Sequence, residues 1–592
     1  MKNLLIYLKK YKKECILAPL FKMLEASFEL FVPLVVANLI DAGILGGDRS
    51  VIYKSFVLLV ALGLIGLTAS LTAQFFAAKA AVNFAADLRH SLFEHILGLG
   101  FPEIDKVGTS TLVTRMTSDV NQLQNGVNMV LRLFLRSPFV VFGAMVMAFT
   151  IDTKSALIFL LVIIVLSFVV FGLMAINIVQ VKKVQAGLEH VLARTRENLD
   201  GVRVIRAFCK EKEEYDAFSQ DNNVLIKALN KAGNFSSFLN PLTFMIINIA
   251  IVGLIYFDVL QVKMGILSQG MVIALYNYMS QILVELIKLA NLIVLVIKAI
   301  ACGNRVSAIF EVKPSQVENI SQEEDLYNQS STETGAADAS EKGTVCEAVR
   351  FEHVSLTYSS SGEESLTDID FSVLKGETVG IIGGTGSGKS SLVGLIPRFY
   401  DATGGRVLVD GRDVKDYSFR ALRKKVGIVM QKAVLFKGTI RTNMLWGDAK
   451  ASDSQLQTAV SDAQAVDVVA GKGGLDADVE QAGKNYSGGQ RQRLSIARTL
   501  TLKPQILILD DSSSALDYLT DLNLRKAINA LDYNPTVFIV SQRCSSVLNA
   551  DKIIVLDDGN VVGIGTHKNL LENCVIYKEI YESQYGKKEE LL

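Results

Sequence analysis

The chain has few residues that form cross-links or bind metal ions. It contains six cysteines and five histidines in 592 residues, and no two cysteines form a CxxC pair. This spacing argues against a disulfide scaffold and against a zinc site. It is typical of a chain whose soluble parts lie in the reducing cytosol. The cysteines are Cys15, Cys209, Cys302, Cys346, Cys544 and Cys574.

Charge is also scarce. Only 20% of the residues are charged, 50% are hydrophobic, and the mean hydropathy of +0.33 favours a membrane protein. The length is too great for one compact core and predicts at least two domains. The basic start, MKNLLIYLKKYKKE, has no small-residue cleavage site after a short apolar core. We expect a retained cytosolic helix along the membrane rather than a signal peptide.

Long apolar stretches are abundant in the first half of the chain. They lie near 15–40, 55–78, 137–151, 155–179, 241–260 and 271–300, and the short third stretch extends back through 127–135. A membrane span needs roughly 20 apolar residues. A soluble core could account for one such stretch but hardly for six, so the pattern predicts six transmembrane helices.

The connections between these stretches alternate in length. Those near 41–50, 152–154 and 258–269 are short, whereas 79–136 and 180–237 are long and rich in Lys and Arg. Positive charge predicts that the long connections face the cytosol. No proline occurs between Pro138 and Pro241, so the spans should continue as long helices. We place the turns of the two arms at 98–108 and near 209–218.

Several polar residues fall inside the predicted spans, where charge is costly and is a functional candidate by default. Glu25 and Glu29 lie one helical turn apart in the first span, and Glu285 and Lys288 are similarly spaced in the sixth. They either line a cavity that meets cationic or amphipathic cargo, or pack against a partner helix, with Glu285 and Lys288 pairing with each other. Amides in the sixth span allow the same two roles. The candidate cavity residues are Glu25, Glu29, Asn277, Gln281 and Glu285.

Composition changes sharply after the last span. Residues 312–345 are polar, acidic and without apolar periodicity, which is typical of a flexible linker. The sequence thus predicts a transmembrane domain at 1–311, a linker at 312–345, a second domain at 346–585 and a charged tail at 586–592.

A phosphate-binding loop opens the second domain. Residues 379–390 read VGIIGGTGSGKS, which fits G-x-x-x-x-G-K-[ST] between an apolar strand and a helical stretch. That context favours nucleotide binding over a glycine-rich turn. Glycines let backbone N–H groups wrap phosphates, Lys389 reaches the β and γ phosphates, and Ser390 binds Mg²⁺. The candidate residues are Gly383, Thr385, Gly386, Ser387, Gly388, Lys389, Ser390 and Ser391.

An acidic pair follows a second buried strand. Residues 506–509 form an apolar run that ends in Asp510 and Asp511. A carboxylate at the tip of a buried strand is placed to hold Mg²⁺ through water. Together the two motifs predict a P-loop nucleotidase that takes ATP and Mg²⁺.

Between these motifs the chain resembles the ATP-binding-cassette (ABC) family. Tyr486 is followed by Ser487, Gly488, Gly489 and Gln490, close to the family signature LSGGQ, and the resemblance covers 346–585 in order. It implies that Tyr358 stacks on adenine and that Gln431 links Mg²⁺ to the membrane domain. It also implies that Asp517 belongs to the loop that follows the acidic pair.

Six spans before such a cassette make the chain similar to an exporter half-transporter. The resemblance implies an all-α six-helix membrane domain and an α/β P-loop nucleotide-binding domain in the cell membrane, with the cassette in the cytoplasm. Two halves would enclose two ATP molecules, each held by the phosphate loop of one chain and the signature of the other. Short helices at the arm tips would dock on the cassettes.

Two positions depart from the family pattern. The resemblance implies a general-base Glu after the strand aspartate and a His in the switch loop, but the chain has Asp511 and Gln542. Asp is shorter than Glu by about 1.5 Å, and misplacement on that scale costs on the order of 10²-fold in rate. Gln cannot carry an imidazolium charge. Either the two residues are tolerated, or this site is degenerate and a different partner chain carries the Glu and His.

The sequence and the family resemblance fit three functions. The chain is a subunit of a heterodimeric exporter of drugs, lipids or peptides, a homodimeric exporter with a working site, or a regulatory or channel-like ABC subunit. Its partners would be a second half-transporter, membrane lipid and a small amphipathic substrate, with no nucleic acid. The six spans argue against a soluble ATPase of DNA repair or translation.

Overall fold

The computed structural model describes residues 2–316, 318, 346–358, 362 and 364–586. It divides into two compact units. The first comprises 1–97 and 109–312, and the second comprises 98–108 and 313–592. The predicted linker from 317 on, residue 318 excepted, and the predicted tail from 587 on lie outside the described residues.

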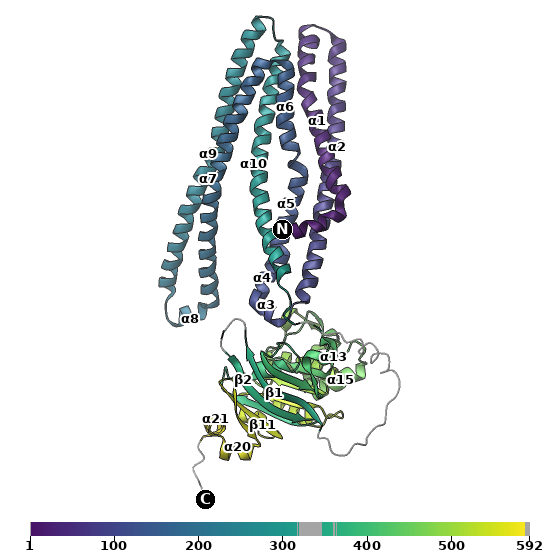
Figure 1. The fold of residues 1–592 in the computed structure, drawn as a ribbon, viewed down its shortest axis with the longest axis vertical. Helices are drawn as coiled ribbons and strands as arrows, with labels where there is room; N and C mark the ends of the chain where they lie inside the picture. The colour runs from purple at the N-terminus through teal and green to yellow at the C-terminus, as the bar shows by residue number, and fades with distance from the viewer. Residues whose placement is uncertain (1, 317, 319–345, 359–361, 363, 587–592) are drawn as a thin grey trace. The chain divides into compact units, whose positions relative to one another are not determined.

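The first unit is all helical (Figure 1). Five helical stretches of the described chain are long and apolar enough to cross a membrane: 4–45, 49–97, 109–151, 153–200 and 241–263. The predicted stretch at 271–300 lies in the 43-residue helix α10, which is not among these five, so a sixth span remains a prediction. The elements are η1 (Lys2–Tyr11), α1 (Lys12–Asn38), η2 (Leu39–Leu45), α2 (Arg49–Leu97), α4 (Thr109–Thr114), η3 (Arg115–Asp119), α5 (Val120–Leu133), α6 (Arg136–Ile151), α7 (Thr153–Asp200), α8 (Val202–Ala207), α9 (Glu211–Lys263) and α10 (Gln269–Glu311).

The second long arm consists of two continuous helices, as predicted. Helix α7 has 48 residues and α9 has 53, so each is over about 70 Å long, far more than the ~30 Å of a hydrocarbon core. They run side by side with α8 at their tip (Figure 1). The first arm turns at 98–108 as expected.

Two boundaries differ from the sequence prediction. The second arm turns at 201–210, not at 209–218, because Gly201 ends α7 and α9 has already begun at Glu211. The last short connection is 264–268 rather than 258–269. Helix α9 continues through Asp258, whose buried carboxylate accepts a hydrogen bond from Ser155 Oγ at 2.7 Å.

Small residues and one proline shape the packing of the spans. Helix α2 packs on α1 and carries a row of buried alanines that includes Ala69, Ala73 and Ala77; small side chains of this kind allow close helix approach. The third span is interrupted between α5 and α6, and Pro138 explains the break because it has no N–H to donate to residue 134. The break places Arg136 at the start of α6.

The second unit is an α/β cassette built on a six-stranded sheet with the order β12-β11-β3-β10-β9-β6. The five strands from β11 to β6 are parallel, and β12 is antiparallel to β11. A four-stranded sheet, β2-β1-β4-β5, and a small β7-β8 pair complete it. The strands are β1 (Glu347–Thr357), β2 (Glu364–Leu374), β3 (Thr378–Gly383), β4 (Gly404–Val409), β5 (Arg412–Asp413), β6 (Val426–Val429), β7 (Gly438–Thr439), β8 (Asp478–Val479), β9 (Ile506–Asp510), β10 (Thr536–Val540), β11 (Lys552–Asp557) and β12 (Asn560–Gly565).

The cassette strands read as continuous apolar runs because both faces of a parallel sheet are covered. All of β9 is buried, and all of β3 but its first residue. Helix α3, from the tip of the first membrane arm, belongs to this unit. The helices are α3 (Phe101–Val107), α12 (Lys389–Leu395), η4 (Val414–Asp416), α13 (Phe419–Lys425), α14 (Ile440–Met444), α15 (Asp453–Asp462), α16 (Val466–Lys472), η5 (Gln481–Gly483), α17 (Gly488–Thr501), α18 (Tyr518–Asn529), α19 (Cys544–Val547), α20 (His567–Asn573) and α21 (Val575–Tyr585).

Candidate nucleotide site and intramembrane charge cluster

A cleft lies at the carboxyl ends of four adjacent parallel strands. The phosphate loop follows β3, Gln542 follows β10, the acidic pair ends β9, and Gln431 follows β6. Carboxyl ends of neighbouring parallel strands share one sheet edge, where α/β folds bind ligands. The cleft is lined by Glu364, Ser365, Thr385, Gly386, Gly388, Lys389, Ser390, Ser391, Gln431, Asp510, Asp511, Val540, Gln542, Asp558 and Gly559.

The phosphate loop needs glycine at the residue before α12. Gly388 has φ 91°, in the left-handed region that other residues rarely adopt. A Cβ there would lie 2.7 Å from the Ser365 carbonyl oxygen. Because Gly388 is the N-cap of α12, the backbone N–H groups of the first turn and the helix dipole face the cleft, as an anion site requires.

Lys389 supplies the positive charge of the cleft. Its Nζ donates to the carbonyl oxygens of Gly383 at 3.0 Å and Gly384 at 2.5 Å. Burial lowers the pKa of Lys389, and the nearby carboxylates of Asp511 and Asp510 oppose that shift. The ammonium is thus held at the phosphate loop beside two acids.

The residues present fit a magnesium ion carried by nucleotide phosphates. Ser390 Oγ donates to Asp510 Oδ1 at 3.0 Å, so a hydroxyl and a carboxylate lie together at the cleft. Burial, with Asp511 adding to it, raises the pKa of Asp510. Among the described residues no group of three or more His, Cys, Asp or Glu could hold a metal. Mg²⁺ normally uses one or two carboxylates plus phosphates and water, which agrees with this donor set.

The two departures from the family pattern lie in this same cleft. Asp511 has φ 44°, and its Oδ2 accepts a hydrogen bond from Gln431 Nε2 at 3.2 Å. Gln542 is exposed in the cleft, and its backbone carbonyl accepts from Gln584 Nε2 at 2.7 Å. The sequence did not predict the Gln431–Asp511 contact, because the two residues come from different strands.

Tyr358 lies next to the cleft rather than in its lining. Its hydroxyl donates to Ser391 Oγ at 2.9 Å, and its ring meets Tyr400 edge-on at 5.0 Å. Ser391 itself lines the cleft. Tyr358 therefore contacts Ser391, the residue that directly follows the phosphate loop.

The signature residues do not line this cleft. Ser487 is exposed and caps α17, where its Oγ accepts from Gln490 N–H at 3.3 Å. Asp517 is exposed and caps α18. Tyr486, the variant first residue of the signature, is 4% exposed, and its hydroxyl donates to the Asp478 carbonyl oxygen at 3.1 Å. The Tyr486 side chain packs in the cassette core, Ser487 and Gly488 are exposed, and Gly489 and Gln490 are half-buried.

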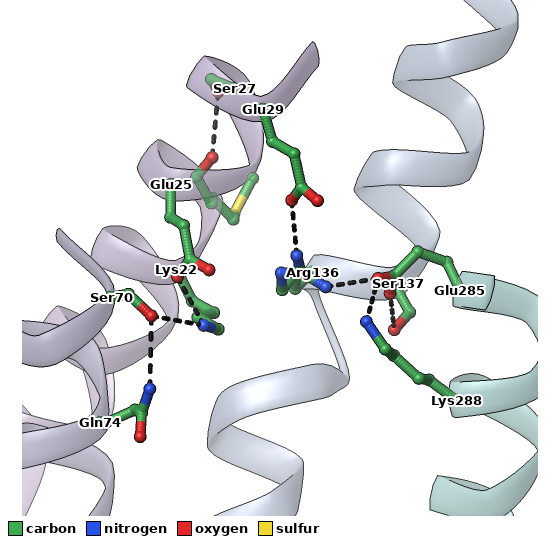
Figure 2. Close-up of polar contacts among 11 residues, drawn as sticks. Lys22, Glu25, Ser27, Glu29, Ser70, Gln74, Arg136, Ser137, Glu285 and Lys288 are labelled. Carbon is green, nitrogen blue, oxygen red and sulfur yellow. Dashed lines mark hydrogen bonds and ion pairs between the residues drawn. The ribbon is translucent and has the colours of Figure 1, made fainter. Parts of the chain in front are cut away.

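The first unit contains a cluster of charges within the predicted spans (Figure 2). Glu25 pairs with Lys22 at 2.5 Å, and Lys22 also donates to Ser70 Oγ at 3.2 Å. Glu29 accepts from Arg136 at 2.6 Å. The predicted cavity carboxylates Glu25 and Glu29 therefore have different partners.

Arg136 joins three helices of this unit. It donates to Glu29 of α1 and to Glu285 of α10, the latter at 2.5 Å (Figure 2). Glu285 also accepts from Ser137 Oγ at 2.7 Å and from Lys288 at 2.8 Å. The Glu285–Lys288 pairing considered from sequence is present, but Arg136 is a further partner.

Sequence reasoning missed Arg136. The signal that could have found it is a single arginine directly before Ser-Pro in the third apolar stretch. Of the two predicted amides, Asn277 is half-buried on α10. Gln281, also half-buried, has an Oε1 atom that is buried and has no hydrogen-bond partner in the described structure.

A helical membrane unit joined to a P-loop cassette defines a membrane transport ATPase. The family descriptions "ABC transporter transmembrane region" and "ABC transporter" match residues 15–286 and 366–514. The uncharacterized ABC transporter ATP-binding protein YfiB of Bacillus subtilis is 32% identical over 99% of each chain. The chain therefore belongs to the ABC transporter family, with a multi-pass membrane domain and a cytoplasmic ATPase domain.

Other similar proteins have more specific names. The putative multidrug export ATP-binding/permease protein YgaD of B. subtilis is 31% identical over 99% of this chain and 98% of its own. An ATP-dependent lipid A-core flippase of Syntrophus aciditrophicus is 29% identical over 85% of this chain and 81% of its own. A bacterial Atm1-family ABC exporter solved with ATP bound has a TM-score of 0.77 over 98% of this chain and 99% of that chain. At 22% identity this last likeness shows the fold alone.

Proposed function

We propose that the chain is one subunit of a heterodimeric ABC exporter that moves amphipathic compounds out across the membrane. Its own phosphate loop contributes to a degenerate, slowly hydrolysing ATP site. The observation that carries this proposal is the composition of the cleft. Lys389, Ser390 and Asp510, to which the family resemblance assigns ATP and Mg²⁺ binding, line the cleft, whereas Asp511 and Gln542 stand where the family has Glu and His.

The two changes weaken hydrolysis more than binding. The Asp511 carboxylate is one methylene shorter than Glu, and it accepts a hydrogen bond from Gln431. Both features keep the Asp511 carboxylate farther from an attacking water. A general base must come within hydrogen-bond reach of that water. Gln542 can donate a hydrogen bond to the γ-phosphate but brings no positive charge to the developing phosphoryl charge. ATP therefore stays bound for long periods at this site.

The signature suits a second chain. Ser487 and Gly488 are exposed and lie outside the cleft of their own chain. In this proposal they complete the cleft of a partner that carries Glu and His at the two catalytic positions. The partner's signature completes the cleft described above. One working site and one slow site result.

The class of cargo is proposed from similarity. YgaD is named for multidrug export and the S. aciditrophicus protein for flipping a lipid. Both kinds of cargo are amphipathic, and charged side chains set among apolar helices suit such compounds. The chain would meet them from the membrane and would not need a nucleic acid.

The test is ATP hydrolysis by the purified chain alone and with its co-expressed partner. We expect the pair to hydrolyse ATP and the chain alone to hydrolyse little. Removing the partner's catalytic Glu should abolish the activity of the pair, whereas Asp511→Ala should change it less than about threefold. Asp511→Glu with Gln542→His should raise turnover at this chain's site by on the order of 10²-fold, measured in a pair whose other site is inactivated.

Other outcomes favour the alternatives. If the chain alone is a vigorous ATPase that loses its activity on Asp511→Ala, the site is not degenerate and the protein is a homodimeric exporter. If the pair conducts ions without coupled ATP use, it is channel-like or regulatory. Both results contradict the heterodimeric exporter.

A further inference from the structure

We infer that the charge cluster of the membrane unit binds a zwitterionic headgroup, with Glu29 taking its cationic part and Lys288 its anionic part. The inference rests on the proposed export function and names the class of its cargo: a zwitterionic amphiphile, such as a phospholipid that bears an amine. It depends on four side chains from three helices, which we call the charge chain: Glu29, Arg136, Glu285 and Lys288.

The four groups alternate in sign along one line of contacts (Figure 2). Glu29 contacts Arg136 at 2.6 Å, Arg136 contacts Glu285 at 2.5 Å, and Glu285 contacts Lys288 at 2.8 Å. The order is therefore negative, positive, negative, positive. One guanidinium and one carboxylate separate the two ends.

Burial separates the ends of the charge chain from its middle. The side chains of Arg136 and Glu285 are 7% and 4% exposed, whereas those of Glu29 and Lys288 are 43% and 42% exposed. The middle pair is a fixed internal bridge, and Ser137 holds the second oxygen of Glu285. The two ends are open to a ligand, and they are opposite in sign.

The ends retain bonding capacity. Glu29 Oε2 is the oxygen held by Arg136, and a carboxylate has further lone pairs to offer on both oxygens. Lys288 Nζ has three protons and makes one described bond, to Glu285. A headgroup can therefore bind at both ends without displacing the internal bridge.

Charge balance selects a zwitterion over a singly charged ligand. The charge chain sums to zero, since two carboxylates oppose one guanidinium and one ammonium. A ligand with one net charge would leave that charge uncompensated in a low-dielectric region, where unpaired charge is costly. A zwitterion adds one charge of each sign and leaves the sum at zero. A neutral ligand would offer neither end a charged partner.

Nearby polar atoms also indicate a ligand or water at this place. Arg136 is 6% exposed and its Nε has no hydrogen-bond partner within the described part of the chain, and neither has Gln281 Oε1. Gln281 lies one helical turn before Glu285 on α10. Buried polar atoms are normally hydrogen-bonded, so a donor and an acceptor remain available beside the charge chain. Exposed charges within spans face an interior space rather than lipid tails.

The test is equilibrium binding of four single-chain probes with the same acyl length. The co-expressed pair is studied in uncharged maltoside micelles without nucleotide. Lysophosphatidylethanolamine carries both charges, lysophosphatidic acid lacks the amine, a long-chain amine lacks the phosphate, and a monoacylglycerol lacks both. We expect the zwitterion to bind at least about tenfold more tightly than each of the others, since one charge-assisted hydrogen bond is worth that much.

Single substitutions test which part of the headgroup each end of the charge chain binds. Glu29→Gln should bring the affinity of the zwitterion down to that of lysophosphatidic acid, and Glu29→Asp should restore much of the difference. Lys288→Gln should bring it down to that of the amine. Glu189→Gln and Lys182→Gln, exposed charges of α7, are matched controls and should leave all four affinities unchanged.

The inference is wrong if the wild-type pair binds the four probes equally, a result that needs no variant to fold. It is also wrong if Glu29→Gln and Lys288→Gln keep the preference. These measurements use no ATP, so they are independent of the export proposal. Loss of headgroup preference with the asymmetric ATPase intact overturns only the inference, whereas headgroup preference without ATP turnover overturns the proposed function.

Discussion

The family resemblance implies that Tyr358 stacks on adenine, and substitution of this residue tests that contact directly. Its ring stands next to the cleft, and its hydroxyl bonds Ser391. If the ring stacks on adenine, Tyr358→Ala should weaken ATP binding about tenfold, since stacking of a base on an aromatic ring is worth on the order of 1–3 kcal/mol. Titration with a fluorescent ATP analogue measures the change.

Tyr358→Phe separates the ring from the hydroxyl. It keeps the stacking surface and removes the hydroxyl that bonds Ser391, so its affinity should stay within about threefold of the wild type. Tyr585→Ala, an exposed tyrosine at the end of α21, is the control for loss of an aromatic side chain. Equal losses for Tyr358→Ala and Tyr358→Phe would contradict stacking and point to the hydroxyl.

The phosphate loop could be predicted because all its residues lie close together in the sequence. A phosphate loop has its glycines, Lys389 and Ser390 within eight positions, and the strand and helix around it are equally local. Arg136 was not predictable in the same way. Its partners Glu29 and Glu285 lie 107 and 149 positions away in the chain, and nothing in the local pattern of α6 specifies them.

At the scale of elements, α3 follows the first membrane arm in the chain and packs within the cassette unit. Its Phe101 ring packs against Phe399 at 4.4 Å between centroids, and Asp105 accepts from the Tyr400 hydroxyl at 2.7 Å. Burial and the Asp105 carboxylate raise the pKa of Tyr400, so this bond persists over the physiological pH range. These contacts join α3 to the segment that follows α12.

Phe101→Ala should therefore uncouple cargo from ATP turnover. Truncating the half-buried ring removes its contact with Phe399, and such aromatic pairs are worth about 0.5–1.5 kcal/mol beyond the area they bury. We expect ATP affinity to stay unchanged and stimulation of the ATPase by cargo to fall at least severalfold. Phe93→Ala, an exposed phenylalanine of α2, is the matched control. Full stimulation in Phe101→Ala would show that α3 does not transmit the signal.

Element lengths were predictable where periodicity is long and uninterrupted. The absence of proline between Pro138 and Pro241 correctly predicted the long helices α7 and α9. The turn between them was misplaced because α8 is only six residues long and a single Gly201 marks it. One glycine in a helical pattern is a weak signal, and a helix can accommodate it. The end of α9 was placed too early because Asp258 is a polar residue that α9 buries.

At the scale of the whole molecule, the division into membrane and cassette parts could be read from composition. What composition could not show is that the tip of the first arm, 98–108, belongs to the cassette unit. That grouping depends on contacts such as Phe101 with Phe399, about 300 positions apart.

The charge chain makes a prediction for the stability of the membrane unit as a whole. Arg136 links α1, α6 and α10, which come from the beginning, middle and end of this unit. Arg136→Met removes the central cation and leaves Glu285, which is 4% exposed, with Lys288 as its remaining cation. Breaking a buried pair in this way costs about 3–5 kcal/mol, so we expect a clear fall in the midpoint of thermal unfolding. Arg196→Met on the exposed face of α7 should not change it.

A second variant distinguishes electrostatics from packing. Replacing both partners, Arg136→Met with Glu285→Leu, leaves no buried charge at the centre, and well-packed apolar pairs are often as stable as the ion pair they replace. The double variant should therefore be more stable than Arg136→Met alone, with most of the loss recovered. It should still lose the headgroup preference, because the bridge between Glu29 and Lys288 is gone. If the double variant is as unstable as the single one, Arg136 stabilises the unit by the volume of its side chain and not by its charge.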